Sequence, residues 1–480
     1  MNTISVVVIL GYLALIIGTI LYNGRKSKKT FKDYALAGGK LPWFVICGTI
    51  VASTIGGGSL MGFVGSFYQY GAMYFWMCIA SLASYLILIF FLSERINRLK
   101  VYTIADIFEM RYGKGAQLVA GFINMFVGIA VGFGMLSSFA SVLSGYLGVE
   151  PNLARIIGGL LFAVTVTMGG LAGAAITGTI QAVVVIGGAL AISAAAFTNA
   201  GGVQGLSQLP SNMLSMGAQN IPPFLFWGMV ASSFFGNFAD QAALFQRINA
   251  ARTPKDAKKA IFLGSIMITV CMALVMVMGL SAKIILGDGI GENDVISELL
   301  KTVNPVLGGV YVAAIIAAVV MTANAMYLSA SMTFSKDLLK QWKPDLSDRG
   351  MVTASRVFVW VMVAAGYVII TFQPSIMKWI LIGYASISCL VLPLYGGLFT
   401  KRATPASGKW SLGLSIAGVI VWEVLGSPFD VNSLFVALIL GILGFVAGFW
   451  NKNGVTEEQL ELVDRFKKKV TAADNVAVGE

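Results

Sequence analysis

Histidine is absent from this chain of 480 residues, and charged residues make up only 11% of it. Without imidazole the chain has no histidine ligand for a metal and no Ser-His-Asp or Cys-His pair for nucleophilic catalysis. Soluble domains average about 25% charged and about 45–50% apolar residues, whereas here 57% are hydrophobic and the mean hydropathy is +0.82. A soluble enzyme and a disordered chain are therefore excluded, and a polytopic membrane protein remains.

Cysteine is scarce as well. The four cysteines each lie in an apolar run, and no two of them have CxxC spacing. This pattern is typical of small buried residues in membrane helices and gives no support to a disulfide framework or a transition-metal site. They are Cys47, Cys78, Cys271 and Cys389.

Apolar runs of about 20 residues are long enough to cross the hydrocarbon core of a bilayer as helices. The first run, 3–23, has neither a basic segment before it nor a small-residue cleavage site, so we expect a retained span and not a signal peptide. We predict an all-α polytopic membrane protein with thirteen transmembrane helices, at 3–23, 41–70, 73–93, 117–147, 154–172, 176–198, 221–246, 260–284, 305–335, 353–373, 377–399, 410–427 and 431–450.

Lysine and arginine are distributed unevenly between the loops. Of the 33 such residues, all but Arg155, Lys283, Lys301 and Lys378 fall on one side if the N-terminus is outside. Because basic loops mark the cytoplasmic side, we expect a multi-pass plasma (inner) membrane protein with its C-terminus in the cytoplasm. The net charge of +11 then favours contact with an anionic lipid leaflet and not with nucleic acid, and we expect a monomer. The basic segments are 24–40, 94–116, 247–259, 336–352 with Arg356, 400–409 and the tail after 450.

Two of the predicted helices contain glycine and polar residues at their middle. They read Val51-Ala-Ser-Thr-Ile-Gly-Gly-Gly-Ser-Leu60 and Ser232-Ser-Phe-Phe-Gly-Asn-Phe-Ala-Asp-Gln241. Such backbone is tolerated in a bilayer where protein or a water-filled cavity satisfies it, although close helix packing is an alternative reason for glycine. The two helices are five apart and therefore cross in opposite senses, as in transporters built from inverted repeats.

The predicted organisation follows from this pairing. The segments are an additional helix with its basic loop (1–40), a first five-helix repeat (41–200), a second, inverted repeat (201–400), two peripheral helices (401–450) and a cytoplasmic tail (451–480).

The tail has Leu460, Val463 and Phe466 at helical spacing, which predicts a short amphipathic helix between Thr456 and Lys469 at the cytoplasmic surface.

Five segments in this order resemble the sodium/solute symporter family, whose members carry sugars, proline, pantothenate, sialic acid, choline and other small solutes. The glycine triplet and the Gln-Arg pair are similar to the choline-transporter branch, and Trp379-Ile-Leu381 is similar to pantothenate permeases. The resemblance implies a leucine-transporter-type fold of 5+5 inverted repeats and a transporter, not an enzyme. The segments are Ala52-Ser-Thr-Ile-Gly-Gly-Gly-Ser-Leu-Met-Gly62, Gly169-Gly-Leu with Gln181, Gln241-Ala-Ala-Leu-Phe-Gln-Arg247, Ala313-Ala-Ile-Ile-Ala-Ala-Val-Val-Met-Thr322 continuing to Ser335-Lys-Asp-Leu338, and Gly397-Leu-Phe399 with Lys401.

The resemblance also implies Na⁺ as the coupling ion. Met321 stands where the family has a hydroxyl ligand, and a thioether is a poor ligand for Na⁺; Ser53 or a water could substitute. The aspartate of a second sodium site is missing beside Thr177-Gly178, so we expect one coupling ion. The implied ligands are the carbonyl oxygens of Ala52, Ile55 and Ala318 and the hydroxyl of Thr322.

Asp240 is a carboxylate inside a predicted span, a position that costs roughly 2.5–3.5 kcal/mol on insertion scales and therefore indicates function. Three roles are open for it. It can pair with Arg247, bind a cationic or amine-bearing substrate, or titrate as a proton site that would make H⁺ the coupling ion.

We expect the substrate pocket at the two breaks. Thr54 and Gln241 stand where a choline carrier would need aromatic rings for cation–π attraction, so choline is disfavoured. The pocket is suited to a small polar solute, either an amino acid or amine, a monocarboxylate or a vitamin, carried by Na⁺-coupled symport; H⁺-coupled symport and a transporter-like sensor are the alternatives. Its predicted residues are Thr54, Gly57, Gly58, Ser59, Asn237, Asp240 and Gln241, with Trp76, Met135 and Tyr384 as further candidates.

Overall fold

The computed structural model describes residues 36–99, 101–217, 221–240, 244–372, 375–451 and 453–467, with Gly11, Ala14 and Gly18, and only the backbone at 38 and 169–177. Apart from those three positions, the predicted helix at 3–23 lies outside the described residues, as do Gln241 and the last part of the tail. The described chain is 85% helical and has no strand, only a parallel bridge between Leu41 and Ala251. The predicted all-α class is confirmed.

The first predicted break is present. Helix α3 (Trp43–Thr54) ends at Ile55, whose φ of −85° and ψ of 82° leave the helical region. The chain resumes in the π-helical turn η2 (Gly58–Gly62) and helix α4 (Phe63–Tyr70), at 55° to α3. The two halves together make one bent candidate span.

The second predicted break is also present. Helix α12 (Pro223–Gly236) continues into the 3-10 turn η5 (Asn237–Ala239), and Asp240 then adopts an extended conformation. The Asp240 carbonyl accepts the N–H groups of both Leu244 and Phe245, and α13 (Gln246–Ala250) follows. Fourteen residues of α12 extend about 21 Å, less than the ~30 Å of a bilayer core, so α12 alone does not span it.

The other helices are long and mostly apolar. The long ones are η3 (Ala72–Phe75) with α5 (Trp76–Ile87), η4 (Leu88–Leu92) and α6 (Ser93–Leu99); α8 (Lys114–Leu147); α9 (Pro151–Asn199); α14 (Pro254–Leu286); α16 (Pro305–Thr333) with η7 (Phe334–Leu339) and α17 (Lys340–Trp342); α18 (Asp348–Phe372); α19 (Ile376–Ser388) with α20 (Val391–Phe399); α21 (Pro405–Val424); and α22 (Ser433–Ala447) with η9 (Gly448–Trp450). The short ones are η1 (Ala37–Gly39), α7 (Ile104–Tyr112), α10 (Gly202–Leu206), α11 (Ser211–Leu214), α15 (Val295–Lys301), η8 (Pro428–Asp430) and α23 (Glu457–Lys467).

Within the described residues, nine helices are long and apolar enough to cross a membrane, or ten with the bent α3–α4 pair. The predicted number of thirteen transmembrane helices is not confirmed. Helix α12 is too short to cross a membrane on its own, α21 is not one of the helices long and apolar enough to do so, and the first predicted helix lies outside the described residues. Helix α9 has 49 residues where two helices were predicted. A straight helix of that length would measure about 74 Å, and two stretches of it, Pro151–Met168 and Gly178–Asn199, each qualify as a span.

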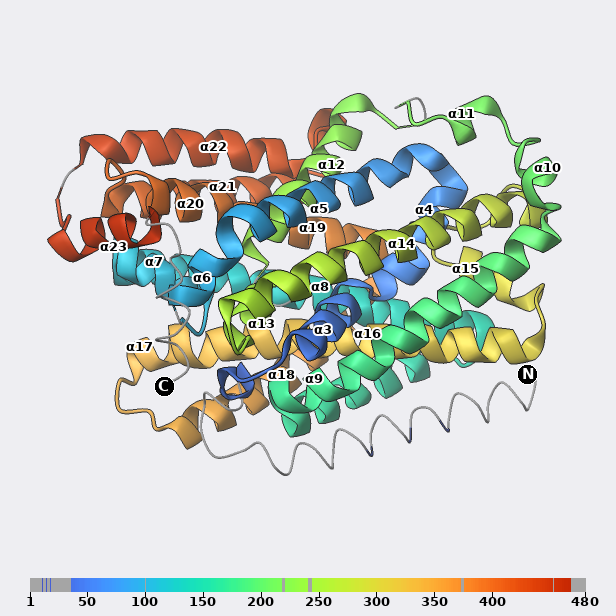
Figure 1. Cartoon of the computed structure of the whole chain (residues 1–480), viewed down its shortest axis with the longest axis horizontal. Coiled ribbons are helices and arrows are strands. Elements are labelled where there is room, and N and C mark those ends of the chain that lie inside the picture. The colour runs from blue at the N-terminus through green and yellow to red at the C-terminus, as the bar shows by residue number, and fades with distance from the viewer. Residues whose placement is uncertain are drawn as a thin grey trace.

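The basic loops that the structure describes gather at one end of the bundle. Figure 1 shows α6, α7, α17 and α23 at the left and α10, α11 and α15 at the right. At the left end Arg111 donates to three backbone carbonyls at or beyond the end of α20, at 2.8–3.0 Å. The predicted tail helix is present as α23, with Val463 and Phe466 buried and the Phe466 ring 5.3 Å from that of Phe399. The clustering agrees with the predicted loop pattern, while the side on which each terminus lies stays a prediction.

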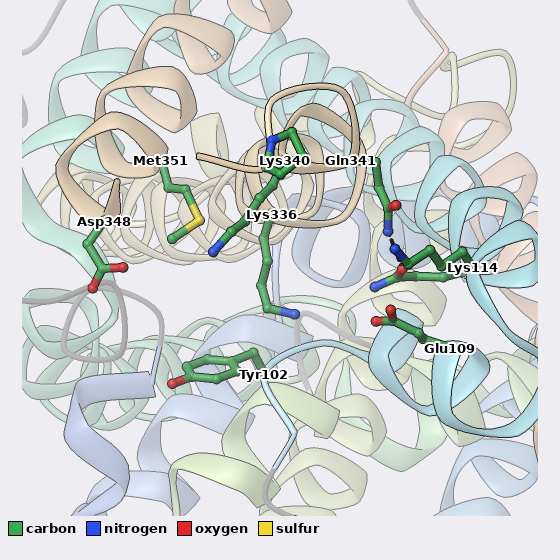
Figure 2. A pocket seen from close by; sticks show the side chains of 10 residues that line it. Tyr102, Glu109, Lys114, Lys336, Lys340, Gln341, Asp348 and Met351 are labelled. Carbon is green, nitrogen blue, oxygen red and sulfur yellow. Dashed lines mark hydrogen bonds between the residues drawn. The ribbon is translucent and has the colours of Figure 1, made fainter. Parts of the chain in front are cut away.

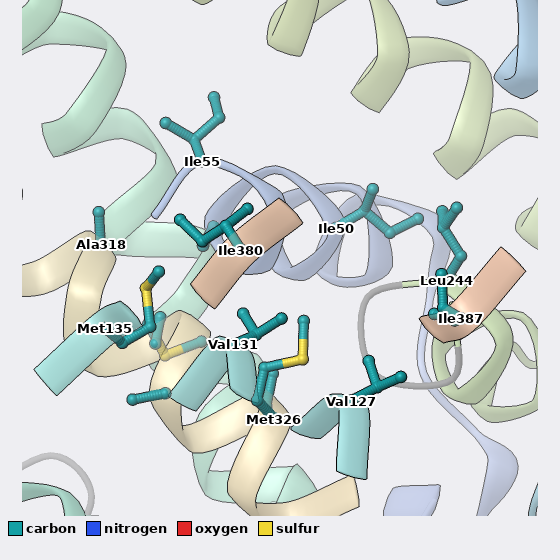
Figure 3. Close-up of a cluster of buried hydrophobic side chains, with 14 of the residues drawn as sticks. Ile50, Ile55, Val127, Val131, Met135, Leu244, Ala318, Met326, Ile380 and Ile387 are labelled. Atoms are coloured by element: carbon teal, nitrogen blue, oxygen red, sulfur yellow. The ribbon is translucent and has the colours of Figure 1, made fainter. Parts of the chain in front are cut away.

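Helices α8 and α16 form the centre of the bundle, and α16 is buried almost throughout. Figure 3 shows Val127, Val131 and Met135 of α8 next to Ile380 of α19 and Met326 of α16. The three α8 residues are spaced four apart, so they share one face of their helix. This apolar layer lies against the break between α3 and α4.

Candidate functional site

The break after α3 releases backbone carbonyls from their helical partners. The Gly56 N–H donates to Thr54 O and not to Ala52 O, and the Ser59 N–H donates to Gly56 O and not to Ile55 O. Among the described residues, no backbone N–H outside the regular helical pattern reaches the carbonyls of Ala52, Ser53 or Ile55. Carbonyl oxygens freed in this way are hard ligands of the kind that coordinate Na⁺ in broken helices.

Thr322 of α16 faces these carbonyls. Its Oγ1 donates toward Ser53 O at 3.2 Å and Ala52 O at 3.4 Å, and the side chain is buried. This approach requires glycine at position 56, because a Cβ there would lie 2.4 Å from Thr322 Oγ1 and 2.9 Å from Thr322 Cβ. The donating hydroxyl retains lone pairs for a cation, so two of the four sequence-predicted sodium ligands, Thr322 and the Ala52 carbonyl, lie side by side.

Ala318 and Met321 precede Thr322 on the same helix, and both are buried. The methyl group of Met321 points toward α9, where a Cβ added to Gly178 would lie 2.7 Å from it. The same Cβ would be 3.4 Å from Thr49 Cγ2 of α3. Met321 therefore fills the space that Gly178 leaves between α16, α9 and α3, which explains why a long apolar side chain fits there.

Two small cavities adjoin the break. One of about 30 Å³ is lined by Ser53, Gly56 and Thr322 from the carbonyl side and by Asn237 and Asp240 from the second broken helix. The other, of about 40 Å³, extends between α5 and α14. The residues common to both are Thr54, Ser59, Phe63, Asn237 and Tyr384. The two helix breaks thus meet, as the inverted-repeat plan predicts.

The predicted substrate residues divide into two groups. Gly57 is a packing residue, because a Cβ there would lie 2.4 Å from Ser138 Oγ of α8 and 2.8 Å from Val319 Cγ2 of α16. It is not among the residues lining either cavity, nor is Trp76, whose indole N–H donates to the Met216 carbonyl. The cavity-lining ones are Thr54, Gly58, Ser59, Asn237 and Asp240, with Met135 and Tyr384.

Several polar groups of the cavity wall are already oriented by hydrogen bonds. Asn237 Nδ2 donates to Ser84 Oγ and to Ser233 O, each at 2.9 Å, so its amide oxygen stays available. Ser59 Oγ donates to Thr54 O at 3.1 Å. The buried Thr54 hydroxyl has no partner of hydrogen-bonding geometry in the part of the chain that the structure describes. The Asn237 amide oxygen and the Thr54 hydroxyl, which lies close to the Tyr85 hydroxyl, are therefore polar groups of the cavity wall.

Asp240 lines the smaller cavity and is 9% exposed. Arg247 is close enough for the two charges to interact, but its Nη1 donates to Gln246 Oε1, and its Nε and Nη2 have no acceptor among the described residues. Asp240 therefore accepts no hydrogen bond from those two nitrogens.

Sequence reasoning missed several lining residues. Phe63, Met77 and Tyr85 line the cavities from the first repeat, and Thr269 and Met272 from α14. Phe63 lies five residues beyond Gly58, so its place directly after the break was a signal in the sequence that it lines the cavities. Met272 and Thr269 belong to an ordinary apolar helix and carried no such signal.

Residues 34–412 of the chain match the Sodium:solute symporter family. The sodium/pantothenate symporter of Escherichia coli (strain K12) is 24% identical over 96% of this chain and 98% of its own length. The sodium/glucose cotransporter of Vibrio parahaemolyticus is 27% identical over 83% of this chain and 76% of its own length.

Solved structures agree on the fold. A Na⁺-coupled sialic acid symporter, in a substrate-bound outward-open state, superposes with a TM-score of 0.80 at 18% identity, covering 95% of this chain and 98% of the other. MhsT in complex with L-phenylalanine gives 0.52 at 16% identity, covering 83% and 98%. The leucine-transporter-type fold expected from the sequence is confirmed, and the chain belongs to the sodium:solute symporter family, a transporter with Na⁺ as its coupling ion.

Proposed function

We propose that this symporter takes up a small polar organic solute together with Na⁺ by alternating access, and that both bind where the two helix breaks meet. The observation that carries the proposal is the contact of Thr322 Oγ1 with the released carbonyls of Ala52 and Ser53, next to a cavity lined by Asp240. Hard oxygen donors converge there and suit a hard cation. The basic end of the bundle faces the cytoplasm in this proposal, with the N-terminus outside.

The sodium site consists of the Ala52, Ile55 and Ala318 carbonyls and the Thr322 hydroxyl. The Ser53 carbonyl supports it in place of the hydroxyl lost at Met321, since it lies 3.2 Å from Thr322 Oγ1 and is released by the same break. This arrangement needs only α3 and α16, whose close approach depends on Gly56.

The solute carries at least one hydrogen-bond donor, such as an amine or a hydroxyl, directed at Asp240. An ionised carboxylate is an acceptor only, and neither cavity is lined by a described Lys or Arg. An amino acid or amine, or a hydroxylated monocarboxylate or vitamin, meets this requirement. Relatives named for pantothenate and glucose fit the same description.

Solute binding requires the helices to separate. The cavities measure about 40 and 30 Å³, enough for a few waters or an ion but well below the roughly 300–1,000 Å³ of organic-ligand sites. The site is therefore closed in this structure. An alternating-access carrier needs such a closed form between its two open ones.

The test is a thermal-shift screen of the purified protein against panels of solutes, with and without Na⁺. A true ligand stabilises the folded protein by mass action. We expect hits that require Na⁺ and that are lost in Asp240→Asn but kept in Glu423→Gln, a peripheral carboxylate bonded to Ser433. Uptake driven by a pH gradient without Na⁺, abolished in Asp240→Asn, would instead make Asp240 a proton site.

A further inference from the structure

A much larger cavity lies away from the helix breaks, at the basic end of the bundle. It has a volume of about 620 Å³ and shares no lining residue with the two cavities at the breaks. Its walls come from α7 with the preceding loop, the first turn of α8, η7 with α17, and the first turn of α18. The volume is in the range of organic-ligand sites. Figure 2 shows Lys114, Lys336 and Lys340 reaching into it from different elements.

We propose that this cavity, which we name the basic-end pocket, binds a phosphate ester through Lys114, Lys340 and the start of α8. The lysines of the pocket are not equivalent. Lys336 Nζ pairs with Asp106 and, at 3.4 Å, with Asp337, so its charge is neutralised. Lys114 and Lys340 form no ion pair within the described chain and remain available.

The start of α8 adds to this positive charge. Helix α8 has 34 residues, its N-cap is Gly113 without a side-chain cap, and its first turn has no acidic residue. Lys114 is its first residue, and Lys409 Nζ lies 2.9 Å from where a Cβ of Gly115 would be. Lysines are unfavourable at a helix N-terminus, which carries partial positive charge and free N–H groups. An anion bound between Lys114, Lys340 and this helix end relieves that repulsion.

The rest of the wall indicates a phosphate ester and not a bare ion. Glu109 and Asp348 also line the pocket, so its wall presents two unpaired lysines and two carboxylates, with Lys336 already paired. Their carboxylates accept hydrogen bonds from a hydroxyl or amine of the organic part. Tyr102 and Met351 supply apolar surface. The phosphate ester can come from a soluble metabolite or from a phospholipid headgroup, since basic pockets at this membrane side also bind headgroups.

The experiment uses the full-length protein in detergent without added lipid. Its melting temperature is followed against glycerol 3-phosphate, with potassium chloride at matched ionic strength as the reference. We expect saturable stabilisation of the wild type and a dissociation constant at least tenfold higher in Lys114→Gln/Lys340→Gln. The matched control is Lys301→Gln/Lys378→Gln, which removes two lysines from other parts of the chain and should bind as the wild type does.

A second measurement separates the two sources. Native mass spectrometry after reconstitution with phosphatidylglycerol or phosphatidylcholine reports retained lipid. If the wild type retains phosphatidylglycerol, Lys114→Gln/Lys340→Gln loses it and glycerol 3-phosphate has no effect, the ligand is a lipid headgroup. If glycerol 3-phosphate stabilises the wild type and phosphatidylglycerol is not retained, the ligand is a soluble ester. If neither compound binds better than the reference, or if binding persists in the double variant while it melts as the wild type does, the proposal is wrong. Lys114→Arg, which keeps the charge, should retain binding.

Discussion

Met321 and Gly178 offer the sharpest test of the sodium site. Met321→Ser places a hydroxyl beside Thr322 on α16, at the position where the family resemblance implies a hydroxyl ligand. The same change removes the methyl group that lies 2.7 Å from a Cβ at position 178 and leaves a void, which for a buried methionine costs about 2–5 kcal/mol. Gly178→Ala refills part of it, since its Cβ then meets Thr49 Cγ2 at 3.4 Å and Thr49 Cα at 3.5 Å, both ordinary contacts.

We therefore expect the double variant Met321→Ser/Gly178→Ala to fold and to bind Na⁺ more tightly than the wild type. A hydrogen-bond-like contact to a charge contributes roughly 1.5–3 kcal/mol, and 1.4 kcal/mol corresponds to about tenfold in affinity. The Na⁺ concentration giving half-maximal thermal stabilisation should fall about tenfold or more. Gly178→Ala alone requires only the flexible end of Met321 to shift, so it should cost less stability than Met321→Ser alone. A well-folded double variant whose half-maximal Na⁺ concentration is unchanged or higher would refute the assigned ligand position.

Three further predictions concern separate parts of the molecule. Thr322→Ala should raise the half-maximal Na⁺ concentration roughly tenfold, since a ligand and its two hydrogen bonds are lost, whereas Thr322→Ser should stay near the wild type; equal behaviour of the two variants would contradict the hydroxyl's role. Burial raises the pKa of Glu292 at the end opposite the basic loops, although the Ser66 hydroxyl donates to it and opposes the shift. The folded state then binds this proton more tightly than the unfolded chain, so stability falls as pH rises from the ordinary carboxyl pKa through the raised one. In thermal melts Glu292→Gln should be more stable than the wild type at pH 8, and this gain should shrink as the pH is lowered. A stability difference that does not depend on pH would argue against the raised pKa of Glu292. Arg111→Lys should lower stability by about 3 kcal/mol, because one ammonium cannot replace donors to three carbonyls at 2.8–3.0 Å, and an unchanged melting temperature would show that the contacts contribute nothing.

Local signals in the chain were sufficient for the fold class. Membrane insertion depends on the hydropathy of each segment and on the charge of the loop beside it, and both are properties of neighbouring residues. The break at Gly56 was readable for the same reason, because glycine destabilises the helix in which it stands. Helix number was less accessible: α9 continues through the predicted loop, and α12 is too short to span on its own.

The site was only partly readable. The family resemblance pointed to Ala52 and Thr322, but their contact joins positions 270 residues apart and depends on how α16 packs against α3. Gly57 and Gly58 look alike in the sequence, yet only Gly58 lines a cavity, since Gly57 lies against Ser138 of α8.

What the sequence by itself determined is a bundle of apolar helices with two breaks and one basic end, because hydropathy, charge and glycine act within a few residues of the chain. The tertiary structure alone decided that Met321 packs against Gly178, that Asp240 lines a closed cavity, and that Lys114 and Lys340 share a pocket. Each of these depends on the close packing of side chains from helices far apart in the sequence, which no local pattern specifies.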